Sequence, residues 1–130
     1  MSYKVIVSGT FEDAIAKVTE TLKQEGFGIL SSIDVQQTLK DKLDVDFRPY
    51  VILGACNPPL AYEALQNDSQ VGLLLPCNVT VQQINDGVVI QIINPEAMLG
   101  IKPLSDNERI ADVAAEANTR LERVAAALSN

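Results

Sequence analysis

The sequence predicts an α+β domain with a mixed sheet, in the element order β-α-β-α-β-α-β-β-α and with the helices mainly on one face. Three observations lead to this fold class. Short segments in which apolar and polar residues alternate are typical of strands, and between them lie longer segments with apolar residues at helical spacing. Asp86-Gly87 between two apolar segments predicts an antiparallel hairpin. The other strands are joined through helices, a connection that favours parallel neighbours.

Composition limits the class of protein. At 130 residues the chain is expected to form one domain, 1–130. No apolar run approaches the ~18 residues that a membrane span needs, and the first residues lack the pattern of a signal peptide. We therefore expect a cytoplasmic protein without membrane contact. The net charge of −7 and the scattered basic residues argue against nucleic acid as a partner.

The first strand and helix are predicted over residues 3–7 and 11–25. Thr10 is expected to cap this helix, and Gly26 supplies the left-handed residue that ends it. A second strand, over residues 27–33, follows.

A second helix is predicted behind Asp34, an N-cap residue with Gln37 in the capping-box position. Its apolar residues fall at positions i, i+4 and i+8, and so narrow a stripe indicates a helix on the surface. These residues are Val35, Leu39 and Leu43.

The third strand, over residues 47–56, is apolar on both faces between residues 51 and 55, as expected in the middle of a covered sheet. Asn57 is a preferred N-cap and Pro58 a preferred first helical residue. A third helix is therefore expected over residues 58–66.

An extended segment over residues 71–84, interrupted at Pro76, enters the hairpin, and residues 88–93 form the returning strand. Residues 96–103 are expected to be an irregular connection, although several of them are too apolar for a plain linker. The last helix starts at a capping box over residues 105–108 and has one apolar stripe of about five turns. The stripe comprises Ile110, Val113, Ala114, Ala117, Leu121, Val124, Ala125 and Leu128.

The two cysteines form the main chemical pattern, because each closes an apolar run and is followed by asparagine, at Cys56-Asn57 and Cys77-Asn78. Cys56 precedes a helix N-terminus, whose amides and macrodipole are expected to lower the pKa of its thiol. If residues 71–77 pair parallel to residues 50–56, both sulfurs reach one sheet edge. They could then bind a thiophilic metal or form a reversible disulfide, with Asn57 and Asn78 as polar neighbours and Tyr62 lining a pocket above them.

The same residues also have plain structural interpretations. Free cysteine is among the most buried residue types, so both thiols are compatible with a place in the core. Asn57 is explained by helix capping alone, and Tyr62 by an exposed helix face. In either case, two free thiols among apolar residues are typical of a reducing compartment.

Several segments spread over most of the chain carry a resemblance to a known family. They are Glu25-Gly26-Phe27-Gly28-Ile29-Leu30, Ile33-Asp34-Val35 with Thr38-Leu39-Lys40, Leu53-Gly54-Ala55-Cys56-Asn57-Pro58, Gly72-Leu73-Leu74-Leu75-Pro76-Cys77-Asn78-Val79 and Pro95-Glu96-Ala97-Met98. In these segments the chain closely resembles the family catalogued as domain of unknown function 302. The resemblance implies a small α+β domain, similar to the TATA-binding-protein-like architecture, that pairs as a homodimer. It implies no activity, cofactor or catalytic residue.

Two functions remain open on the sequence. It favours a small dimeric cytoplasmic binding module with a pocket near Cys56 and Cys77, for a small molecule or a thiophilic metal. The dimer would bury part of the sheet or the apolar connection over residues 98–101. The alternative is a thiol-dependent redox or sulfur-transfer enzyme that uses Cys56. Because the chain has no histidine, a helix dipole or a distant lysine would have to activate that thiol.

Overall fold

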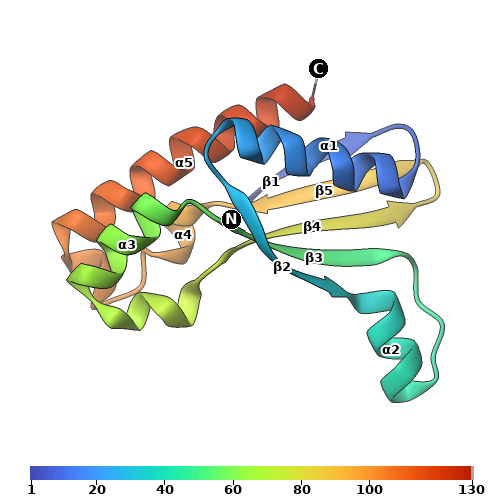
Figure 1. Cartoon of the computed structure of the whole chain (residues 1–130), viewed down its shortest axis with the longest axis horizontal. Coiled ribbons are helices and arrows are strands. Elements are labelled where there is room, and N and C mark those ends of the chain that lie inside the picture. Colours follow the sequence, from blue (N-terminus) through green and yellow to red (C-terminus); the bar gives the residue numbers. More distant parts are fainter. Residues whose placement is uncertain (130) are drawn as a thin grey trace.

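The computed structural model describes residues 1–129, which hold one five-stranded sheet, five α-helices and two short 3₁₀ helices (Figure 1). In chain order the elements are β1 (Ser2–Val7), α1 (Phe11–Gln24), β2 (Gly28–Asp34), α2 (Val35–Leu43), β3 (Tyr50–Cys56), α3 (Pro58–Asn67), η1 (Ser69–Leu74), β4 (Cys77–Ile84), β5 (Gly87–Ile93), α4 (Pro95–Met98), η2 (Leu104–Asp106) and α5 (Glu108–Leu128). None of the helices in residues 1–129 combines the length and the apolar character that a bilayer crossing requires.

Neighbouring strands in the sheet are all antiparallel, in the order β1-β5-β4-β3-β2. The expectation of a mixed sheet is therefore wrong. Helices α2 and α3 do not carry the chain back along the sheet. Each lies in a long connection beyond one end of the two strands that it joins, so the second strand returns antiparallel to the first. Helix α1 joins the two edge strands, β1 and β2, which are not neighbours.

Helices α1 and α5 lie side by side over one face of the sheet, and the main apolar core fills the space between these two layers (Figure 1). Side chains of both helices and of the central strands are fully buried there, among them Val18, Leu22, Val79, Ile90, Leu121 and Val124. The sheet and its helices establish the α+β class. The more specific TATA-binding-protein-like architecture stays a prediction.

The N-caps predicted for the first three helices are confirmed. The side chains of Thr10 and Asp34 accept hydrogen bonds from backbone amides at the starts of α1 and α2. Asn57 does the same at the start of α3. Gly26 has a φ of 83° and follows the last turn of α1, the position in which a residue without a side chain costs least.

Residues 71–76 do not extend β4, contrary to the sequence prediction. Most of this segment belongs to η1, because the side chain of Asp68 accepts a hydrogen bond from Gln70 N and starts a turn. Val71 is then fully buried in a second, smaller apolar cluster formed with residues of α3, α5 and the connection between α4 and α5. Strand β4 begins only at Cys77.

The expected capping box before α5 is also wrong in its details. The cap is Asn107, whose Oδ1 accepts a hydrogen bond from Ile110 N at 3.1 Å, whereas Ser105 lies in η2. The connection expected to be irregular over residues 96–103 begins with the short helix α4, which Asn94 caps. These differences are local and leave the buried stripe of α5 as predicted.

The sheet face opposite α1 and α5 carries almost no charge, and we call it the open face. Strand alternation places there Ser2, Lys4, Ile6, Ser31, Ile33, Tyr50, Ile52, Gly54, Asn78, Thr80, Gln82, Ile84, Val89, Gln91 and Ile93. Helix α2 projects beyond the sheet on this side (Figure 1). It buries no residue of its own.

Candidate functional site

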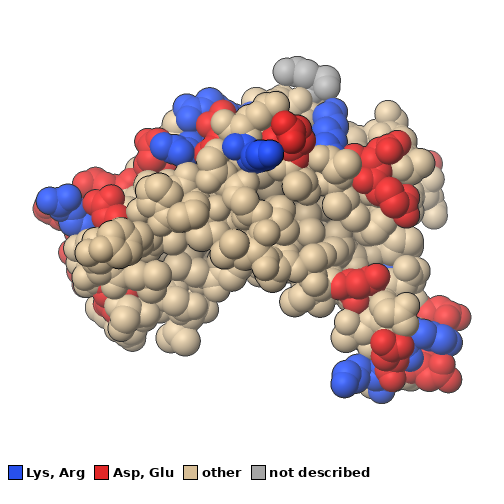
Figure 2. All heavy atoms as spheres, viewed as in Figure 1, with Lys and Arg blue, Asp and Glu red and all other residues tan. Residues whose placement is uncertain are grey.

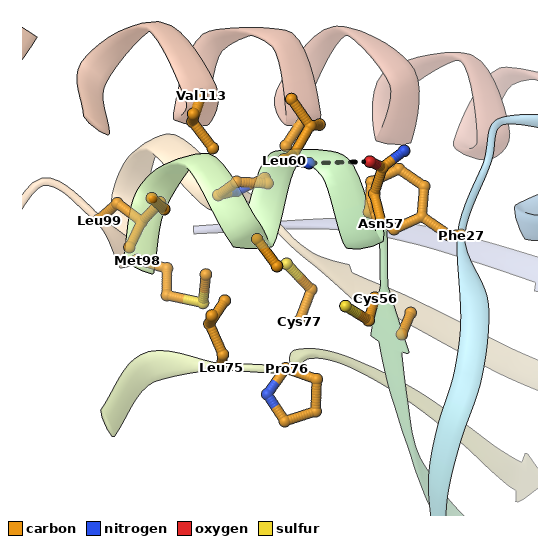
Figure 3. A pocket seen from close by; sticks show the side chains of 15 residues that line it. Phe27, Cys56, Asn57, Leu60, Leu75, Pro76, Cys77, Met98, Leu99 and Val113 are labelled. Atoms are coloured by element: carbon orange, nitrogen blue, oxygen red, sulfur yellow. Dashed lines mark hydrogen bonds between the residues drawn. The ribbon is translucent and has the colours of Figure 1, made fainter. Parts of the chain in front are cut away.

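An apolar cleft lies between the end of β3, the start of β4 and helices α3, α4 and α5 (Figure 3). Its walls come from five parts of the chain that are far apart in sequence. They are Phe27 before β2, residues Ala55, Cys56, Asn57, Leu60, Ala61 and Ala64 from the end of β3 into α3, residues Leu75, Pro76 and Cys77, residues Pro95, Met98 and Leu99 around α4, and Val113 and Ala117 of α5.

The cleft lies where the two apolar clusters meet. Leu60 packs against both clusters, with the main core on one side and Ala64, Leu99 and Val113 on the other. Helix α4 is held in place as a wall because Asn118 Nδ2 of α5 donates a hydrogen bond to Glu96 Oε1 at 2.9 Å. The cleft is therefore the space left where the two apolar clusters, each packed within itself, come together.

Nearly all the exposed atoms of the cleft are carbon and sulfur. Asn57 is the polar exception, and it is the one buried polar side chain in the part of the chain that the structure describes. Its Oδ1 accepts a hydrogen bond from Leu60 N at 3.1 Å, and Figure 3 shows its amide nitrogen pointing away from the cysteines. The free volume is about 30 Å³, enough to hold a water molecule or a methyl-sized group.

The expected pairing of the two cysteines is wrong. Both are free thiols, and β3 and β4 run antiparallel, with Ala55 opposite Cys77. Cys56 is one residue further along β3, so by strand alternation its side chain leaves the sheet on the other side from that of Cys77. Both thiols nevertheless border the cleft.

The expectation of an activated Cys56 thiol is also wrong. Burial raises the pKa of Cys56 above its ordinary value. Burial, and to a smaller extent the charge of an ionised Cys56, raises the pKa of Cys77 to about 11.

The start of α3 has no donor that could reverse these shifts. Pro58 and Pro59 have no amide hydrogen, and Leu60 N already donates to Asn57. A helix N-terminus favours a thiolate chiefly through free amides, and here the first ones are missing or occupied. Both thiols are therefore protonated at neutral pH.

A metal site receives little support from the cleft. Residues 1–129 contain no group of three or more His, Cys, Asp or Glu side chains that could hold a metal ion. Cys56 and Cys77 have no carboxylate beside them on the cleft wall. A metal held by these two residues stays a prediction of the sequence.

The other residues that the sequence singled out lie elsewhere. Asn78 is on the open face, opposite Gly54 of β3. Tyr62 is 65% exposed on α3, and its hydroxyl accepts a hydrogen bond from Gln66 Nε2 at 3.0 Å. The structure thus brings Cys56, Asn57 and Cys77 to one cleft and leaves Asn78 and Tyr62 outside it.

Most of the cleft wall was not identified from the sequence. The sequence predicts Leu60 and Ala64 only as residues of a third helix, and Met98 and Leu99 only as part of an unusually apolar connection. That excess of apolar residues in a connection was the one available signal. It could not show which other elements the connection faces.

The comparisons with known proteins agree on one family. Residues 3–128 match the model of the family described as "Domain of unknown function DUF302". The chain is also similar to a solved structure described as "Crystal structure of uncharacterized conserved protein DUF302 from Bacillus stearothermophilus". The two are 35% identical with a TM-score of 0.83, over 95% of this chain and 94% of that chain. No curated protein matches.

Proposed function

The chain belongs to the DUF302 family, for which no activity is known, and from its own cleft we propose that it is a small binding module for an uncharged, apolar ligand. The observation that carries the proposal is the chemistry of the cleft wall. Carbon and sulfur atoms form nearly all of it, and the oxygen of Asn57 already has a partner. Such a wall stabilises apolar groups by burial and offers a charged ligand nothing in return for its lost hydration.

The properties of the two thiols favour a binding module over a thiol-dependent enzyme. A thiol-dependent enzyme needs a thiolate or a nearby base, and the pKa values of Cys56 and Cys77 are raised. A thiophilic metal needs several ligands that converge, and residues 1–129 hold no group of three or more His, Cys, Asp or Glu side chains that could supply them. We therefore place a small molecule, in preference to a metal, in the cleft.

The size of the cleft limits the ligand. A volume of about 30 Å³ admits a methyl-sized group without rearrangement, far less than a drug-sized molecule needs. Leu75 and Met98 form part of the wall, and methionine changes rotamer more easily than most core residues. We propose that a short branched alkyl group enters when these two side chains move apart.

We also propose that the module works in the cytoplasm and as a homodimer. Two free thiols are typical of a reducing compartment. The dimer is supported by the open face, whose mixture of apolar and uncharged polar side chains is typical of an interface.

A titration with a small alcohol tests the ligand proposal. Isobutanol added to ¹⁵N-labelled protein should shift the amide resonances of Ala64, Cys77 and Leu99 and should saturate. Isobutyrate has a similar shape and a charge, so we expect it to bind at least about tenfold more weakly, because its carboxylate finds no partner in the cleft.

Two variants, each with one alanine replaced by leucine, make the test specific. Ala61→Leu adds a larger side chain at the cleft wall and should abolish the isobutanol shifts. Ala115→Leu makes the same change on the exposed face of α5 and should leave them intact. Equal shifts in both variants, or tighter binding of isobutyrate, would contradict the proposal.

A further inference from the structure

We propose that the open face and an arm beside it form one contact surface for a second copy of this chain. The arm comprises residues 35–49, that is, α2 and the loop that follows it. This inference rests on the proposed homodimer and adds to it where the two copies meet. Figure 2 shows the arm as a separate lobe with a hollow between it and the body of the molecule.

The open face is the first observation. Of the residues that define it, Lys4 alone is charged, and it lies on an edge strand. Over the whole chain, 27 residues are charged, because 10 are basic and 17 acidic. Figure 2 shows charged side chains gathered over the helices and on the arm, with an uncharged area between. Depletion of charge is the compositional mark of an interface core.

The arm is the second observation. No residue of the arm is buried, and none belongs to either core cluster. Its apolar side chains are nevertheless partly or largely exposed, and Leu43 is 66% exposed at the end of α2. An amphipathic helix normally buries its apolar stripe, whereas Val35 and Leu39 of α2 are only partly covered by the described residues and Leu43 is left exposed.

The arm is also held in a fixed position by contacts within it and with the open face. Gln36 Nε2 donates a hydrogen bond to Phe47 O at 2.9 Å across the loop. Arg48 lies over the Phe47 ring at 4.4 Å, and its Nε donates to Gln82 Oε1 of the open face at 2.8 Å. Fixing the arm before binding reduces the entropy lost on association.

The area of the open face explains why the arm is needed. Five strands about 4.8 Å apart and about seven residues long cover roughly 24 Å by 24 Å, or about 570 Å². A stable interface buries about 800 Å² on each partner. The face alone falls short of this area, and the arm supplies the difference.

Charge favours a second copy over another kind of partner. Two chains with a net charge of −7 repel each other where their carboxylates meet, and the open face has none. The three aspartates of the arm are balanced by Lys40, Lys42 and Arg48, and Lys40 pairs with Asp44 at 2.9 Å. A basic partner would instead be drawn to the acidic helical surface. The chain also has both a projecting arm and, beside Tyr50, Thr80 and Gln91, a hollow of about 230 Å³ in the open face. A two-fold pair uses both features in each copy.

Sedimentation equilibrium of the full chain and three variants tests the surface. The unaltered chain should reach twice its mass of 14.1 kDa as concentration rises. Thr80→Lys puts a charge at the centre of the face and should weaken association about a hundredfold, and Leu43→Glu on the arm about tenfold. Leu73→Glu changes a residue that is 84% exposed on η1, outside the surface, and should change nothing.

Each outcome separates this inference from the homodimer itself. A chain that stays monomeric at every concentration removes both. A dimer that Thr80→Lys and Leu43→Glu leave as tight as the unaltered chain keeps the homodimer and overturns this surface. Loss of association in Thr80→Lys alone overturns the role of the arm. Far-ultraviolet circular dichroism of each variant shows that the fold is retained.

Discussion

The thiol of Cys77 takes its properties from its place in the sheet. Its side chain is 7% exposed on the cleft wall, and burial is the main reason that its pKa is raised to about 11. A cysteine in the unfolded chain has a pKa near 8.5 to 9. The folded protein therefore holds a proton that the unfolded chain releases over the interval between these values.

This difference predicts how stability depends on pH. At pH 7 the thiol is protonated in both states and contributes nothing. Between about pH 9 and 11 the unfolded state loses the proton first, so the free energy of unfolding should fall by about 1.4 kcal/mol per pH unit. Urea unfolding of the unaltered chain and of Cys77→Val at pH 8, 9, 10 and 11 measures it. The variant should lack the contribution of Cys77 and so show a shallower fall, and identical slopes would contradict the burial of the thiol.

Single residues were predictable from the sequence where their role is local. Asn57 was expected to cap α3, and its bond to Leu60 N confirms this. The lowered pKa expected for Cys56 was wrong, although the reason was already present in the sequence. Pro58 and Pro59 remove the amides that would have stabilised a thiolate.

Helix α5 shows what could be predicted at the scale of an element. The apolar spacing gave its buried stripe in full, and all eight expected residues are buried. A helix of this length has many apolar positions in one phase, so the pattern is hard to mistake. Segment 71–76 had the opposite property, since its short apolar run fits a strand or a buried turn equally well.

The buried stripe of α5 predicts that alanine substitutions at Leu121 and at Glu116 change the free energy of unfolding by very different amounts. Leu121 is fully buried in the main core, so Leu121→Ala should lower the free energy of unfolding by about 2–5 kcal/mol. Glu116 is on the exposed face and pairs with Arg120. Glu116→Ala should therefore change the free energy of unfolding by less than about 0.5 kcal/mol. Denaturant unfolding compares the two variants. Similar losses at both positions would mean that the buried face has been misassigned.

At the scale of the molecule, the pairing of strands was the part that the sequence could not supply. The sequence predicts helices in the first three connections, but the direction of each helix relative to the sheet decides whether the next strand is parallel or antiparallel. The predicted pairing of Cys56 and Cys77 assumed that β3 and β4 are parallel, and it is wrong because the two strands are antiparallel. The cleft is likewise formed by residues from 27 to 117, whose proximity only the folded chain establishes.

The proposed binding function requires that the cleft accepts an apolar guest. A crystal of the protein pressurised with xenon tests this most directly, because xenon enters dry apolar cavities and avoids polar ones. We predict xenon density in the cleft, beside Ala64, Cys77 and Leu99, and none there in Ala61→Leu. Ordered water in the cleft would contradict the proposed function. A cleft without xenon, in a crystal that shows xenon bound at other positions, would also contradict it.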